Sequence, residues 1–103
     1  MSDPIVIEAD AVELIPVTLV GQSYKVKPPK AALAMRLATE SKLYRDDPSK
    51  MMAVLDEWMS RAFGKDAAKV KKRLDSPDDD LDITNIMALM EKVIERQTGN
   101  PTS

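Results

Sequence analysis

Two runs of charged residues lie next to each other between residues 65 and 82, and they are the first candidates for chemistry. The first run places five basic residues within nine positions: Lys65, Lys69, Lys71, Lys72 and Arg73. Such a cluster is a candidate patch for nucleic acid, so a small nucleic-acid-binding regulator using residues 65–73 is one functional class to consider. The alternative is the solvated face of a short helix, whose C-terminal cations offset the helix dipole. Because an acidic run follows at once, we favour the helix face and expect no nucleic acid as a partner.

The acidic run has the opening of a calcium loop. Asp78, Asp80 and Asp82 show the alternate spacing with which an EF-hand begins. That loop next requires Gly and, at its twelfth position, a bidentate Glu, but this chain has Ile83 and Leu89 there. Capping of the following helix explains the acids without a metal. We therefore predict no metal site and no cofactor.

Catalytic side chains are scarce. The chain has no Cys and no His, which removes thiol nucleophiles, thiolate metal sites and the commonest general base. Hydroxyl groups such as those of Ser41 and Thr84 have no recognisable base and no third, orienting group beside them in the sequence. We expect a protein that is not an enzyme.

The elements that position these residues indicate one α+β domain of 103 residues. Apolar spacing and turn residues predict a flexible arm over 1–14, a domain over 15–98 and a polar tail over 99–103. Within the domain we predict a β-hairpin at 16–27 and helices at about 30–45, 48–63, 67–74 and 82–98. No apolar run is long enough to span a bilayer and no signal peptide begins the chain, so we expect no membrane contact and a cytoplasmic protein.

The hairpin sequence VTLVGQSYKV suggests its own register. A two-residue turn at Gly21 and Gln22, with Gly first as in a type II′ turn, predicts the pairs Leu19 with Tyr24 and Val17 with Val26. Two strands leave an open edge, and we expect copies of the chain to pair there. The residues of this predicted self-association edge are Val17, Thr18, Leu19 and Val20.

Methionine is frequent, with seven in the chain, and aromatic residues are few. The Met-rich stripes on the second and fourth predicted helices are either the domain's own core or a surface for a partner helix. Because flexible Met side chains adapt to different partners and specify a rigid interior weakly, we expect part of the set to line a partner-binding groove. The predicted groove residues are Met52, Leu55, Trp58, Met59, Met87 and Met90.

Three segments together resemble a known family. They are the hairpin VTLVGQSYKV followed by Pro29-Lys30-Ala31, the acidic stretch RLDSPDDDLDI over 73–83, and the closing segment RQTGNPTS over 96–103. In this order and spacing they resemble the tail assembly chaperones of long-tailed, siphovirus-type phages, above all those that infect actinobacteria. The chain is similar to the short product or shared domain of that family, and it lacks the Ser-Gly-rich tail that often follows.

The resemblance implies a function. Members of the family oligomerise in the host cytoplasm and coat the tape measure protein before the tail tube polymerises. Programmed frameshifting usually gives a second, longer product, so the implied partners are the tape measure protein, the chain's own copies and the longer product. The tail tube protein is a further candidate. A head–tail connector component of the virion remains an alternative.

Overall fold

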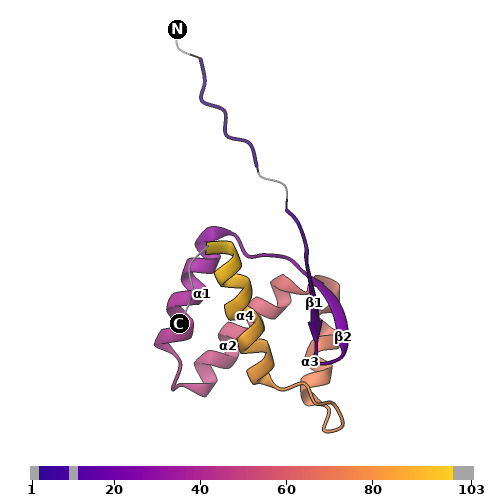
Figure 1. Ribbon diagram of the computed structural model, residues 1–103. Helices are drawn as coiled ribbons and strands as arrows, with labels where there is room; N and C mark the ends of the chain where they lie inside the picture. Colours follow the sequence, from indigo (N-terminus) through magenta and orange to yellow (C-terminus); the bar gives the residue numbers. More distant parts are fainter. Residues whose placement is uncertain (1–2, 10–11, 99–103) are drawn as a thin grey trace.

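The computed structural model describes residues 3–9 and 12–98 of the chain and has the predicted α+β architecture (Figure 1). A hairpin comes first, and helices follow. The elements are β1 (Ile15–Leu19), β2 (Gln22–Val26), α1 (Ala31–Leu43), α2 (Pro48–Ala62), the short 3₁₀ turn η1 (Gly64–Asp66), α3 (Ala67–Asp75) and α4 (Ile83–Thr98). Residues 3–9 and 12–14 have no regular secondary structure, and the predicted polar tail lies outside the described residues.

Local sequence signals set the limits of α2. Asp47 is its N-cap, and its Oδ1 accepts a hydrogen bond from the backbone N–H of Lys50 at 3.2 Å. Pro48 occupies the first helical turn, where its missing N–H costs nothing. Gly64 follows the helix with φ of +55°, the left-handed conformation that ends many helices. These boundaries were predicted.

The start of α3 differs from the prediction. Asp66 was expected to cap this helix, but its side chain accepts no capping hydrogen bond. The 3₁₀ turn η1 leads directly into α3, so Asp66 has right-handed helical backbone angles and is not in the extended conformation of a capping residue. Its carboxylate instead lies 3.9 Å from the Lys69 ammonium.

The hairpin turn lies one residue earlier than predicted. Val20 and Gly21 are its central residues, both with positive φ, 44° and 81°, as in a type I′ turn. The strand pairs are therefore Leu19 with Gln22, Val17 with Tyr24 and Ile15 with Val26. Compared with the prediction the register shifts by two residues, so every side chain keeps its predicted face. Val20, which did not fit the alternation, is a turn residue.

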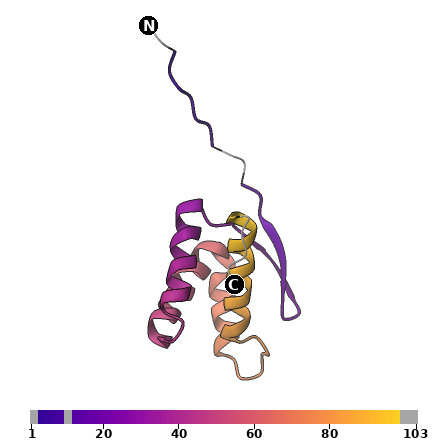
Figure 2. The ribbon, with the colours of Figure 1, turned by 60° about the vertical axis from the view of Figure 1, so that its left-hand side comes forward.

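The core lies between the hairpin and the four helices. Helix α4 packs against α1 and α2, and the hairpin lies on the side of the body away from α1 (Figures 1 and 2). Small side chains let α1 approach α4 closely, with Ala34 and Leu37 fully buried. At the other side Leu19 and Val26 bring the hairpin into the same core. One continuous cluster thus holds all the elements together.

A substitution at the turn tests the backbone strain at Val20. A β-branched residue is poorly suited to positive φ, whereas Asn followed by Gly is the preferred pair for a type I′ turn. Because Val20 lies outside the core cluster and is 37% exposed, its replacement removes no core contact. We expect Val20→Asn to raise the free energy of unfolding by about 1 kcal/mol in urea titration. An unchanged or lower value would contradict the strained turn.

Candidate protein-binding surfaces

Most of the predicted groove residues are in the core. Leu55, Trp58, Met59 and Met90 are between 0 and 2% exposed. They pack against other helices of their own chain, so they line no open groove, and the prediction is wrong for these four. Met87 is half-buried at the edge of the cluster. Among the six only Met52 is well exposed, at 47%.

An aromatic chain explains why Trp58 is inside. The Trp58 and Phe63 rings meet edge to face with centroids 5.8 Å apart, and Phe63 meets Tyr24 in the same way at 5.5 Å. Such contacts add to the burial of the rings. They connect α2 to β2 through Phe63, the residue that directly follows the helix, so these rings serve to attach the hairpin. The Trp58 indole N–H has no hydrogen-bond partner among the described residues.

Stability measurements distinguish core from surface at these positions. Trp58→Ala should lower the free energy of unfolding by about 3–5 kcal/mol, because it empties a large volume in the core. Met52→Ala should change it by less than about 0.5 kcal/mol, since Met52 is 47% exposed and lies outside the core cluster. Chemical denaturation of both variants checks this contrast. Equal, small effects would mean that Trp58 is not part of the core.

Other apolar side chains are exposed instead. On the helices they are Met35 and Leu43 of α1, 66% and 69% exposed, together with Met52 of α2. On the N-terminal segment they are Ile5, Val6, Ile7, Val12 and Leu14. The helical spacing could have identified Met35, because it falls off the face formed by Ala34 and Leu37. These residues are the apolar groups that a partner can reach.

The basic run is largely used within the domain. Lys71 Nζ lies 2.9 Å from an Asp56 carboxylate oxygen and donates to the Ser60 hydroxyl, and Lys69 faces Asp66. In the part of the chain that the structure describes, only Lys65 and Lys72 of the five have no ion-pair partner. A continuous patch of five free cations is therefore not present on α3.

Arg73 has a structural role that the sequence did not reveal. Its Nε and Nη2 donate to the two carboxylate oxygens of Asp79 at 2.7 and 3.1 Å. Nη1 donates to the Leu19 carbonyl at 2.8 Å and to the Tyr24 hydroxyl at 3.1 Å, and Nη2 donates to the Val20 carbonyl at 2.7 Å. All five N–H donors of the guanidinium are used. One side chain thus joins α3, the acidic loop and the hairpin turn.

This contact changes the titration of both partners. The hydrogen bond from Arg73 lowers the pKa of Asp79, and the backbone N–H of Leu81 contributes to the same shift. The same hydrogen bond raises the pKa of Arg73. Because the Asp79 pKa is lower in the folded than in the unfolded chain, the carboxylate stabilises the fold fully above its ordinary pKa of about 3.9. That contribution is lost as the pH falls through the lowered pKa.

An Asp79→Asn variant tests this dependence. Above about pH 4 it should be less stable than the wild type, because the guanidinium loses its charged partner. The difference should shrink as the pH falls through the lowered pKa of Asp79. Urea titrations between about pH 2 and 7 measure it, with the exposed neighbour substitution Asp80→Asn as the control. A pH-independent difference would contradict the assigned role.

The predicted self-association edge offers few backbone groups. A two-residue turn closes on a hydrogen-bonded pair, so Val17 and Leu19 direct their N–H and C=O groups towards β2. The Val20 carbonyl is used by Arg73. Only Thr18 directs both backbone groups outwards, and Pro16 has no N–H to give. Pairing of copies at this edge stays a prediction. The outward backbone groups that could take part span a shorter stretch than the predicted residues 17–20.

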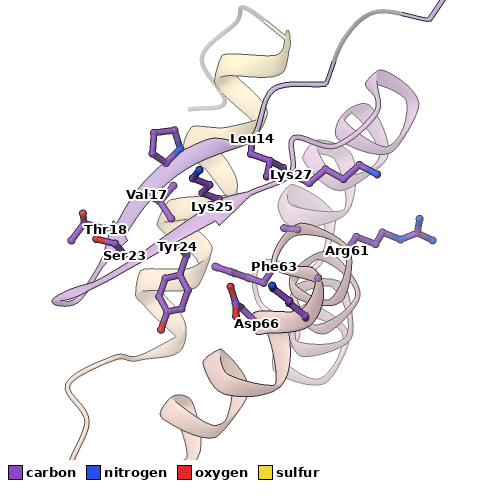
Figure 3. Close-up of a pocket in the computed structure, with 14 residues that line it drawn as sticks. Leu14, Val17, Thr18, Ser23, Tyr24, Lys25, Lys27, Arg61, Phe63 and Asp66 are labelled. Atoms are coloured by element: carbon purple, nitrogen blue, oxygen red, sulfur yellow. The ribbon is translucent and has the colours of Figure 1, made fainter.

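A cavity of about 770 Å³ lies between the hairpin and the junction of α2 with α3 (Figure 3). Its apolar part comes from both strands of the hairpin, the segment before them and the end of α2: Leu14, Pro16, Val17, Tyr24, Ala62 and Phe63. Basic side chains surround it: Lys25, Lys27, Arg61 and Lys65. The sequence did not indicate this site, because its residues come from two segments, 14–27 and 61–66, that are far apart in the chain. Its chemistry suits an apolar segment with negative charge.

Among the residues that the structure describes, no three His, Cys, Asp or Glu side chains are close enough to hold a metal ion. None of the described helices combines the length and the apolar character needed to cross a lipid bilayer. No family model, curated protein or solved structure matches this chain.

Proposed function

We propose that this chain is a non-enzymatic tail assembly chaperone of the siphovirus type, which oligomerises and coats the tape measure protein before the tail tube polymerises. The proposal rests first on the resemblance of the hairpin, the acidic stretch over 73–83 and the closing segment. The order of elements, a hairpin followed by helices, agrees with the architecture that the resemblance implies.

The observation that carries the proposal is apolar surface outside a closed core. Met35, Leu43 and Met52 are 47 to 69% exposed although the helices that bear them are well packed on their inner faces. The three residues lie outside the core cluster, so their exposed parts are available to another protein. We assign the contact with tape measure helices to these three residues of α1 and α2, in place of the predicted groove.

The physical demands of the task suit such a surface. A tape measure protein is long, largely helical and striped with apolar residues, and it would aggregate if left uncovered. Flexible Met side chains adapt to varied sequences along it. Each contact with the tape measure protein is small, so many copies are needed for a stable coat. Because each copy binds weakly, competing tube subunits can displace it. The longer frameshifted product and the tail tube protein are the further partners, and the host cytoplasm is the expected location.

Co-expression with the tape measure protein tests the assignment. The wild-type chain should keep that protein in the soluble fraction and co-purify with it. The triple variant Met35→Asp, Leu43→Asp and Met52→Asp should reduce the recovered complex at least tenfold, since three charges replace the apolar contacts. A matched control places the same charge at exposed alanines of the same helices, Ala32→Asp and Ala53→Asp.

Two outcomes would overturn the proposal. Full protection of the tape measure protein by the triple variant, with folding verified by circular dichroism, would remove the assigned surface. Detection of the chain in purified particles by mass spectrometry, in stoichiometric amounts, would favour the head–tail connector instead.

A further inference from the structure

The N-terminal segment over residues 3–9 leaves three neighbouring apolar side chains in water. Ile5, Val6 and Ile7 are 90, 71 and 87% exposed. The segment runs away from the domain in both views of the ribbon (Figures 1 and 2). Isoleucine and valine favour extended backbone, and an uncovered run of them is a hazard for non-specific pairing. We therefore expect a specific partner to cover these side chains.

The outer edge of β2 has the backbone groups to receive an extended segment. Because Gln22 and Tyr24 bond to β1 in the observed register, Ser23 and Lys25 direct their N–H and C=O groups away from it. No hydrogen bond within the described residues uses these four groups. The edge is closed further along, where the Lys27 N–H donates to the Ala62 carbonyl at 2.9 Å. The open stretch therefore suits a short strand.

Charge complementarity indicates which segment fits. The 770 Å³ cavity beside this edge is ringed by Lys25, Lys27 and Lys65, which have no ion-pair partner in the described structure, and by Arg61, which lies 3.6 Å from Glu57. Asp66 is the one acidic side chain in the lining, and it faces Lys69. Residues 3–14 contain acidic groups, Asp3, Glu8, Asp10 and Glu13, and no Lys or Arg. Opposite charges steer the two surfaces together.

We propose that residues 4–8 of one copy add as a third strand to the outer edge of β2 in a second copy. Ile5 and Ile7, which share one face of an extended segment, enter the cavity over Tyr24 and Phe63. The acidic groups on either side then lie against the basic rim. A second copy is the occupant because residues 3–9 lead away from their own domain and do not turn back across the end of β2.

This contact joins two different surfaces, a segment and a strand edge, so a pair of copies bound this way still has one free segment and one free edge. Repetition of such a head-to-tail contact builds a ring or an open chain of copies. The inference rests on the proposed function only for the expectation that copies associate. The location of the contact comes from the strand register, the exposure and the charges.

Light scattering coupled to gel filtration measures the association. The mean mass of the wild-type full chain should rise with concentration and fall when salt is added. The arm variant Ile5→Asp with Ile7→Asp should weaken association at least tenfold. So should the edge variant Ser23→Pro, which removes an outward N–H and places a ring at the edge. Ala53→Asp, which adds the same charge at an exposed position of α2 outside both surfaces, should leave association unchanged.

Mixing the two variants gives the decisive result. The arm variant keeps an intact edge and the edge variant keeps an intact arm, so an equimolar mixture should form a complex of two chains although neither variant associates alone. If the edge variant fails to fold by circular dichroism, Lys25→Glu with Lys65→Glu replaces it, because reversing the rim charge should have the same effect.

Three results would overturn the inference: a wild-type chain that stays monomeric at all concentrations, an arm variant that associates like the wild type, or a mixture that forms no complex. A monomer in which the segment binds its own domain would give the first. Retention of the tape measure protein by a monomeric wild type would leave the binding part of the proposed function standing and remove only the self-association. Normal self-association without tape measure binding would overturn only the proposed function.

Discussion

The position of the hairpin on the helical body depends on the guanidinium of Arg73. A two-stranded hairpin is marginal in water by itself and must be held by other elements. Here a single planar cation binds two turn carbonyls, the Tyr24 hydroxyl and both oxygens of Asp79, so the hairpin, α3 and the loop before α4 meet at one point. The side chain of Arg73 is only 14% exposed, and within such a site each unmade hydrogen bond is expensive. The position of the hairpin is therefore tightly specified.

Helix limits could be predicted from the sequence, whereas the hairpin turn, which Arg73 contacts, could not. Helix limits follow from neighbouring residues: Asp47 and Pro48 begin α2, and Gly64 ends it, so the sequence was sufficient there. The hairpin turn was not decided locally, because Gly21 suits the first position of one turn type and the second position of another. Carbonyl contacts to a residue more than fifty positions away accompany the observed choice. No short stretch of sequence contains that information.

Burial of the Met-rich stripes was misjudged for a related reason. Periodicity shows which face of a helix is apolar, but not whether the partner face comes from the same chain. Small residues on α1 let α4 approach, and the hairpin covers the remaining side, so Met59 and Met90 are enclosed. Composition alone suggested looser packing than four helices and a hairpin achieve together. The exposed residues Met35 and Leu43, by contrast, could be identified from the helical spacing.

The N-terminal segment has a consequence for how such a protein changes over generations. None of residues 3–9 is buried, so replacing them removes nothing from the interior that keeps the domain folded. Selection on that segment is free of the constraint that acts on Trp58 or Arg73. The pairing that we infer for this segment can therefore change its specificity while the body of the domain stays constant.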